Sequence, residues 1–349
     1  MWYLRRRCVL ACLLCVALAR GGAIAAPATR EIIDGAGRHV MIPENVMRVA
    51  DPWHANNAMV LMLGGAAKLV ATSDQAKSQP WLRRLYPPIE RIPAAFNASG
   101  DVNMETLIGA RPDVILMAYG GALPRWFAAV DSAYQIPVVL MPNTSLDGLK
   151  TTALLTGEVL GSKELGVARE FVRYFNANIQ RVMQVTGRFA AKARPKVLHT
   201  SSAGILTADG RHTVIDDWID IAGGVNAATV AGYVRPVTME QVAAWNPDVI
   251  IVGSAPNPQN RQAILDDPRW REINAVKNGK VFVNPSGAYL WDRHSAEAAL
   301  QVLWAAKLLH PAEFADLDVG KETKLFYARF FHYELSDAEV ASILNSTPP

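Results

Sequence analysis

Short apolar runs alternate along the first half of the chain with amphipathic stretches of helical period. Four runs are typical of buried strands, and an apolar stretch with 3.6-residue spacing, Asn56–Leu63, predicts a helix between the first two. Strands that alternate with helices favour βαβ units, which place parallel strands in one sheet. The four strand-like runs are Asn45–Ala50, Lys68–Thr72, Asp113–Met117 and Pro137–Met141.

A long stretch without proline and with few glycines follows, from Ser145 to Ala193. Its leucine, valine and phenylalanine residues recur at helical spacing, which predicts one kinked helix or two consecutive helices. The strand and helix rhythm resumes after Pro195. We therefore expect an α/β fold with two Rossmann-like lobes, residues 26–145 and 194–349, bridged by a helical region at residues 146–193.

The second lobe shows the same kind of pattern. A capping box at Ser336–Glu339, in which serine and glutamate are three residues apart, predicts the start of its final helix. The other expected elements are the strands Lys196–Thr200, Gly204–Ala208, Asp248–Gly253 and Lys280–Val283, and the helices Val214–Ala222, Asp267–Ile273 and Ser295–Leu309.

The N-terminus has the pattern of a secretory signal peptide. Three arginines precede the apolar run Cys8–Ala19, and the small residues Ala23–Ala25 supply a cleavage site. The run is shorter than the about 20 apolar residues that a spanning helix needs. We expect cleavage near Ala25 and a periplasmic product. Cys12 follows a loose lipobox, so a lipid anchor is the less favoured alternative.

Removal of this segment changes the composition. All three cysteines of the 349-residue chain lie within it, as do four arginines and no acids. Lys plus Arg falls from 35 to 31 against 32 Asp plus Glu, so the formal charge changes from +3 to −1. A near-neutral, cysteine-free chain gives no support to nucleic-acid binding, to membrane insertion or to disulfides.

An internal repeat connects the two halves. Val102–Leu116 aligns without a gap with Val237–Ile251, and seven of the fifteen positions are identical. In each copy a Met-Glu pair opens a short helix, and a Pro-Asp pair ends it before a buried Val-Ile strand. A shared Met-Glu at a fixed offset favours duplication over a chance likeness.

Together these landmarks resemble the periplasmic substrate-binding proteins of the iron–siderophore, cobalamin and haem ABC importers. Both copies of the repeat carry the resemblance, with Asp34–Arg38, Met62–Thr72, Ile221–Asn226 and Trp291–Ser295. It covers about residues 30–345 and implies two Rossmann-like lobes bridged by a single long helix, with the ligand in the cleft between them. It also implies that Glu105 and Glu240 dock onto a dimeric permease that works with its ATPase.

Candidate ligand contacts follow the strands, because the carboxyl ends of parallel strands face the cleft in such folds. Aromatic rings suit a flat or greasy metal chelate, and arginine suits an anionic one. His54 and His294 are candidate metal ligands, and a helix expected from Ser295 disfavours the charged form of His294. The candidates are Trp53, His54, Tyr119, Tyr233, Arg235, Tyr289, Trp291, Arg293 and His294, with Ser73, Asp74, Gln75 and Ser254 nearby.

The other histidines have less to recommend them. His199 is expected to be buried and satisfied, while His39, His212, His310 and His332 are expected at the surface. No His-rich loop points to a bare-ion site, no permanent cofactor is implied, and a ferric siderophore ranks above a nickel or cobalt chelate or haem. The alternatives are an exported sensor domain and, because tetrapyrrole chelatases share a related architecture, an enzyme of that class.

Overall fold

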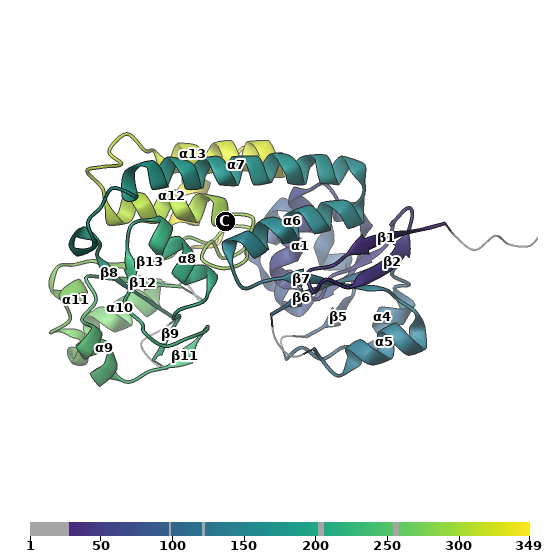
Figure 1. The fold of residues 1–349 in the computed structure, drawn as a ribbon, viewed down its shortest axis with the longest axis horizontal. Helices are drawn as coiled ribbons and strands as arrows, with labels where there is room; N and C mark the ends of the chain where they lie inside the picture. Colours follow the sequence, from purple (N-terminus) through teal and green to yellow (C-terminus); the bar gives the residue numbers. More distant parts are fainter. Residues whose placement is uncertain (1–27, 98, 121–122, 202–205, 254–257) are drawn as a thin grey trace, which may run out of the picture.

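The computed structural model describes residues 28–97, 99–120, 123–201, 206–253 and 258–349. It forms two α/β lobes side by side, each built around a parallel sheet (Figure 1). The expected signal peptide, all three cysteines and Ser254 lie outside the described residues, as does the start of the expected strand Gly204–Ala208. The two-lobed α/β class is confirmed.

The N-terminal sheet has the strand order β5-β4-β3-β6-β7, and all its pairings are parallel. A hairpin of β1 (Thr29–Ile33) and β2 (His39–Pro43) precedes it. The sheet strands are β3 (Val49–Ala50), β4 (Leu69–Ser73), β5 (Ala94–Phe96), β6 (Val114–Tyr119) and β7 (Val138–Pro142). The helices are α1 (His54–Met62), α2 (Asp74–Ser78), α3 (Pro80–Leu85), α4 (Met104–Gly109) and α5 (Trp126–Tyr134).

The C-terminal sheet has the order β10-β8-β12-β13, again parallel, with an antiparallel pair of β9 and β11 beside it. The strands are β8 (Lys196–Thr200), β9 (Thr207–Ala208), β10 (Val225–Asn226), β11 (Arg235–Pro236), β12 (Val249–Val252) and β13 (Val281–Val283). The helices are α8 (Val214–Ile221), α9 (Met239–Trp245), α10 (Pro258–Asp266), α11 (Asn274–Lys277), α12 (Ala298–Leu309), α13 (Val319–Phe326) and α14 (Asp337–Leu344).

Two consecutive helices connect the sheets, α6 (Leu146–Leu160) and α7 (Ser162–Thr186). Gly161 separates them with a φ of 138°, a conformation that residues with a Cβ rarely adopt. Figure 1 shows α7 running along the top of both lobes, and it packs on α6 at one end and on α8 and α12 at the other.

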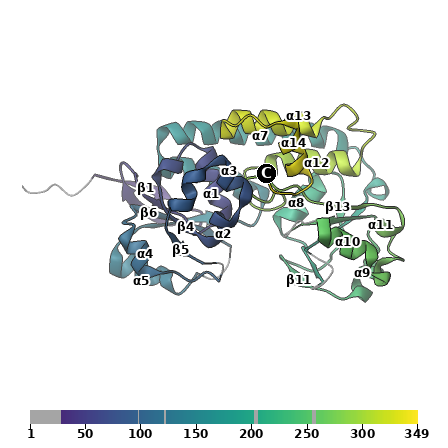
Figure 2. The same ribbon diagram turned by 180° about the vertical axis from the view of Figure 1, so that it is seen from behind.

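The C-terminal segment makes a second connection between the lobes (Figure 2). Trp81 of α3 donates its indole N–H to the carbonyl of Thr347 at 3.1 Å, and Arg84 donates to the hydroxyl of Tyr333 at 2.9 Å. The last residues of the chain are therefore anchored on the N-terminal lobe.

The repeat occupies the same place in both sheets. Helix α4 leads into β6, α9 leads into β12, and each strand lies next to an edge strand. The aspartate of the Pro-Asp pair makes a similar contact in both lobes. Asp113 accepts the main-chain N–H groups of Met47 and Arg48 just before β3, and Asp248 accepts that of Lys196, the first residue of β8. The aspartates thus hold the amino-terminal ends of β3 and β8.

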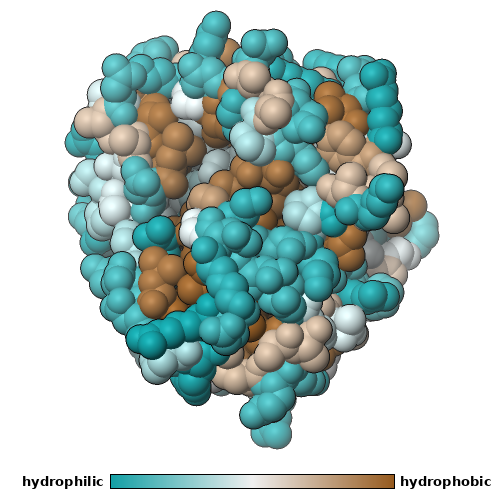
Figure 3. Space-filling model, turned by 90° about the vertical axis from the view of Figure 1, so that its left-hand side faces the viewer, coloured by the Kyte–Doolittle hydropathy of each residue, from teal (hydrophilic) through white to brown (hydrophobic). Residues whose placement is uncertain are grey.

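The outer end of the C-terminal lobe is mainly hydrophilic, with apolar atoms in separate patches (Figure 3). Across the described residues, no helix combines the length and the apolar character that crossing a bilayer requires.

Candidate functional site

A cavity of about 320 Å³ lies where loops of the two lobes meet. The N-terminal lobe contributes the start of α1 and the loop after β7, and the C-terminal lobe contributes the loops before β11 and before α12. It is lined by Trp53, His54, Ala55, Asn143, Tyr233, Val234, Tyr289, Leu290, Arg293 and His294. Six of the nine expected ligand contacts are therefore brought together here: Trp53, His54, Tyr233, Tyr289, Arg293 and His294.

A buried carboxylate positions the N-terminal wall. Asp51 follows β3 and accepts the main-chain N–H of Trp53 and the side-chain amide of Asn56, each at 3.0 Å. Burial raises the pKa of Asp51 well above its usual value, against the hydrogen bonds from Trp53 and Asn56. The bend that this contact holds turns Trp53 and His54 toward the cavity at the start of α1.

A second buried carboxylate organises the C-terminal wall. Glu297 accepts the main-chain N–H groups of Ala288 at 3.0 Å and Tyr289 at 2.9 Å, and the indole N–H of Trp291 at 3.1 Å. The hydroxyls of Tyr327 and Ser295 also donate to it. Burial raises the pKa of Glu297 to about 6, although these donors oppose the shift. Glu297 therefore holds the loop that carries Tyr289, Arg293 and His294 through several hydrogen bonds.

Rings from opposite lobes pack against each other across the cavity. The ring centroids of Trp53 and His294 are 5.8 Å apart, and those of His54 and Tyr289 are 5.1 Å apart. Each histidine thus meets an aromatic ring of the other lobe, so the two walls are in direct contact.

Both histidines of the cavity are held in their neutral form. Burial lowers the pKa of His294 to about 3, against a hydrogen bond with the main chain of Ser145, and burial lowers that of His54 to about 4, against a hydrogen bond with Gln75. The sequence predicts a helix that starts at Ser295 and keeps His294 neutral through its dipole. This is wrong, because α12 begins only at Ala298 and the three preceding residues form a turn. Desolvation supplies the effect instead.

His294 has a free ring nitrogen. Its Nε2 atom is buried and has no hydrogen-bond partner among the described residues, and its side chain lines the cavity. A buried polar atom without a partner costs about 1–3 kcal/mol, which makes this nitrogen a candidate contact for a ligand or a water molecule. Among the described residues, no three His, Cys, Asp or Glu side chains lie close enough to hold a metal ion.

Arg293 is the only ionised group among the ten described residues of the lining. Its guanidinium makes two hydrogen bonds to Asp209, at 3.1 and 3.0 Å, and lies over the ring of Tyr233 at 5.2 Å from the centroid. Asp209 belongs to the loop after β9, and sequence reasoning missed it because nothing local marks it. Asn143 was also missed, although its place after the fourth expected strand was a usable signal.

Three expected contacts lie elsewhere. Trp291 has 0% of its surface exposed and is part of the main core, so it cannot touch a ligand in this cavity. Its indole N–H is already donated to Glu297, and an apolar ring that can bond at one edge suits the core as well as a cleft. Tyr119, at the end of β6, and Arg235, on β11, are exposed but do not line it.

Of two histidines outside the cavity, one has the expected burial and one does not. His199 is fully buried as expected, with both ring nitrogens bonded to carboxylates. His310 is wrong as a surface residue: it is 7% exposed, packs on Phe189, and bonds the carbonyl of Gly223.

A second hollow of about 320 Å³ adjoins the cavity and shares Trp53 and His54 with it. It is lined by the N-terminal lobe alone, including Gln75, Phe96 and Trp126. The two hollows together form a groove with an aromatic, uncharged half and a half that carries Arg293.

A larger hollow of about 690 Å³ lies between α6 and α8 and is also lined by β10. Two of its cations are paired with acids of the same lining: Lys150 with Asp147 at 2.6 Å, and Arg194 with Asp220 at 2.9 Å. The orphaned nitrogen of His294 distinguishes the smaller cavity from it.

The two repeated glutamates lie exposed in the first turns of matched helices. Glu105 follows the cap Asn103 of α4, and Glu240 lies between Thr238 and Gln241, which form the capping box of α9. A hydrogen bond with Thr238 holds the pKa of the Glu240 carboxyl below its usual value. Figure 1 shows α4 and α9 at the lower edge of their lobes, on the side away from α7.

The sequence and the fold both match known binding proteins. Residues 54–288 match the family described as "Periplasmic binding protein". The molybdate-binding protein MolA of Haemophilus influenzae is 30% identical over 346 residues, which cover 91% of this chain and 95% of that protein. The structure of MolA bound to molybdate aligns with a TM-score of 0.78 at 27% identity, covering 88% of this chain and 99% of that one. A periplasmic solute binding protein from Veillonella parvula aligns with a TM-score of 0.78 at 26% identity, covering 91% and 97% of the two chains.

Proposed function

The chain belongs to the periplasmic binding protein family that serves ABC importers, and on that premise we propose that it captures a small metal oxyanion in the cavity between its lobes. Like its relatives, it is a binding protein and not an enzyme. The proposal rests above all on the guanidinium of Arg293, the one ionised group among the ten described residues that line the cavity.

The chemistry of the lining favours an oxyanion. Arg293 supplies a guanidinium, which matches oxyanions in shape and charge. The rings of His54 and His294 are neutral, so the guanidinium of Arg293 alone sets the charge of the lining. None of the ten described residues that line the cavity is acidic, so an anion meets no like charge there.

The size of the cavity points the same way. Its volume of about 320 Å³ lies at the lower end of the roughly 300–1,000 Å³ typical of small-molecule sites. The relative MolA binds molybdate, and this chain aligns with it over nearly its whole length. We therefore place molybdate and oxyanions of its shape first among candidate ligands.

A ferric siderophore, which the sequence alone favours, is the second candidate. The adjoining hollow with Phe96 and Trp126 supports it, because aromatic walls suit the organic part of a chelate. In that arrangement the chelate would extend from Arg293 into the second hollow. His54 and His294 as direct metal ligands, in a nickel, cobalt or haem complex, stay a prediction of the same kind.

We also propose that the chain is exported by its N-terminal signal and delivers its ligand to a permease dimer and its ATPase through Glu105 and Glu240. Two carboxylates on matched helices of the two lobes fit a partner with twofold symmetry. An exported sensor would use the same surface, and growth of a deletion strain at limiting molybdate separates the two roles.

The proposal is tested by titrating the purified mature protein with sodium molybdate, sodium sulfate, haem and a ferric siderophore, using calorimetry. We expect saturable binding of molybdate with one site per chain. Binding of the siderophore alone would overturn the oxyanion proposal in favour of the second candidate. Binding of none of the four would overturn both.

A further inference from the structure

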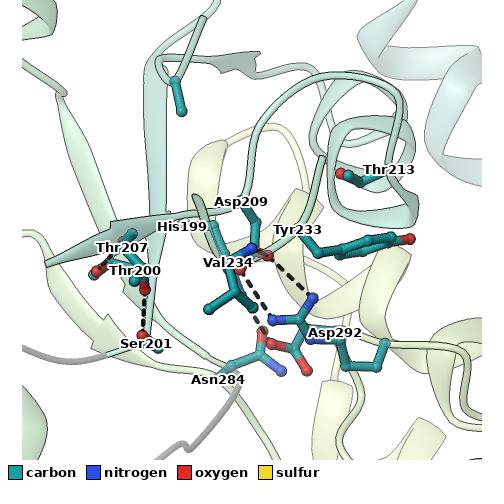
Figure 4. Close-up of polar contacts among 12 residues, drawn as sticks. His199, Thr200, Ser201, Thr207, Asp209, Thr213, Tyr233, Val234, Asn284 and Asp292 are labelled. Atoms are coloured by element: carbon teal, nitrogen blue, oxygen red, sulfur yellow. Dashed lines mark hydrogen bonds and ion pairs between the residues drawn. The ribbon is translucent and has the colours of Figure 1, made fainter. Parts of the chain in front are cut away.

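A chain of charged groups runs from Arg293 through Asp209 and His199 to Asp292. Figure 4 shows Asp209, His199 and Asp292 close together. Asp209 is its centre: one carboxylate oxygen accepts from Arg293 and from the main-chain N–H of Val234, and the other accepts from Arg293 and faces His199. All the oxygen lone pairs of Asp209 are therefore in use, so the position of Arg293 depends on how firmly Asp209 is held.

His199 lies between two carboxylates. Its Nδ1 is 2.8 Å from an oxygen of Asp209, and its Nε2 is 2.8 Å from an oxygen of Asp292. A neutral imidazole would place a ring lone pair against a carboxylate oxygen at one of these contacts. The geometry is satisfied when both ring nitrogens carry a proton and both donate.

Among the described residues, Arg293 is the one other cation paired with the aspartates around His199. The edge of Trp218 from α8 meets its ring, and Gly253 at the end of β12 approaches so closely that a Cβ there would lie 2.0 Å from Nε2. The charged groups that face the ring or its partners are Asp209 after β9 and Asp292 and Arg293 before α12. With a charged His199, two positive and two negative groups balance.

We propose that His199 is a positioning residue of the anion site: its doubly protonated ring fixes Asp209, and through it Arg293, and its charge keeps the two aspartates from cancelling the attraction of Arg293 for an anion. This inference rests on the proposed function. If His199 loses one proton, the buried group carries a net negative charge beside the cavity, and anion binding weakens.

Other groups support this assignment. Burial lowers the pKa of His199, but the hydrogen bonds and charges of Asp209 and Asp292 more than reverse this, and the net shift is upward. The cavity histidines do not compete for this role, since their pKa values of about 4 and about 3 keep them neutral near pH 7. Glu297, with a pKa of about 6, titrates in the more acidic part of the range.

The experiment compares the wild-type protein with His199→Gln and with the control His310→Gln, which removes another buried histidine of the same lobe. Molybdate affinity is measured by calorimetry from about pH 5 to about pH 9. We expect His199→Gln to bind molybdate at least about tenfold more weakly at neutral pH, because one nearby positive charge is lost. The wild-type affinity should fall as pH rises through the alkaline part of this range, and His199→Gln should lack that step.

A second measurement needs no variant. ¹⁵N NMR of histidine-labelled wild-type protein reports whether each ring nitrogen of His199 is protonated, and we expect both to be protonated at neutral pH with molybdate bound. A neutral His199 ring in that complex would overturn the inference, and so would equal affinities of wild type and His199→Gln. Failure of the wild type to bind any anion at any pH would instead overturn the proposed function.

Discussion

Trp53 at the start of α1 and His294 before α12 pack against each other across the two lobes, with ring centroids 5.8 Å apart. Asp51 accepts the main-chain N–H of Trp53, and Glu297 accepts the main-chain N–H of Tyr289 in the loop that carries His294. The cavity is therefore shaped by two independent polar anchors, each within a single lobe. A change at one anchor should alter only one wall.

The contact makes Trp53 a reporter of binding. We expect molybdate to change the tryptophan fluorescence of the wild-type protein, because a ligand at His294 alters the surroundings of the Trp53 ring. Trp53→Phe should lose most of this change. The matched control is Trp245→Phe, which alters a half-buried tryptophan at the end of α9, far from the cavity. An equal loss in both variants would contradict the assignment of the site.

Arg293 should contribute most of the attraction for the ligand. Hydrogen bonds to charged groups contribute about 1.5–3 kcal/mol, so Arg293→Gln should weaken molybdate binding by roughly 10-fold to 100-fold. Arg293→Lys should recover only part of this, because lysine keeps the charge but cannot bond Asp209 with two parallel N–H groups. Calorimetry checks both, with Arg235→Gln as the control on the exposed strand β11. If Arg235→Gln weakened molybdate binding and Arg293→Gln did not, the assignment of the site to the cavity with Arg293 would be contradicted.

The neutral His294 should make the protein sensitive to acid. Its pKa is about 3 in the folded chain against a usual 6.5, so below about pH 6.5 the unfolded chain binds more protons and stability is lost as the pH falls. At pH 5 this group alone should lower the free energy of unfolding by about 2 kcal/mol. His294→Gln, which cannot take a proton there, should flatten the loss between pH 7 and pH 5. Urea unfolding at both pH values checks the difference, and parallel curves for the two proteins would contradict it.

Much of this fold could be predicted from the sequence because its strands are fully buried and therefore read as continuous apolar runs. The predicted starts of helices and strands were wrong where a hydrogen bond to a residue outside the element holds the chain. The helix expected from Ser295 begins only at Ala298, since Glu297 is committed to the preceding loop. The strand expected over Asn45–Ala50 is confined to Val49–Ala50, because the residues before it are tied to Asp113 of the repeat.

The site was harder to predict for a similar reason. Loops after strands supplied most of the lining, and that rule requires only topology. Asp209 was missed because its partners stand 10 residues away at His199 and 84 residues away at Arg293. Trp291 was misplaced because burial, which decides between core and cleft for an aromatic ring, is not written in the local sequence.

Glu297 should be a main source of stability in the C-terminal wall. Glu297→Gln replaces one acceptor oxygen by an N–H₂ group, which faces donors whichever way the amide is turned. A donor left unsatisfied in the interior costs about 1–3 kcal/mol, and we expect a loss of that size in the free energy of unfolding, with weaker molybdate binding. Tyr327→Phe removes a single donor and should cost less. Chemical denaturation orders the two variants, and a larger loss for Tyr327→Phe would contradict this account.

The repeated glutamates should separate transport from binding. Glu105 and Glu240 are exposed on α4 and α9, away from the cavity, so the double variant Glu105→Ala, Glu240→Ala should bind molybdate like the wild type. Uptake of molybdate by cells that carry this variant should fall to the level of a deletion strain, because both contacts with the permease are lost together. Each single variant should retain part of the uptake.

The control Glu44→Ala, Glu313→Ala removes one exposed glutamate from each lobe outside the repeat and should transport normally. Normal uptake by the Glu105, Glu240 variant, or a loss of binding in it, would refute the docking role, since the first separates these carboxylates from delivery and the second ties them to the cleft.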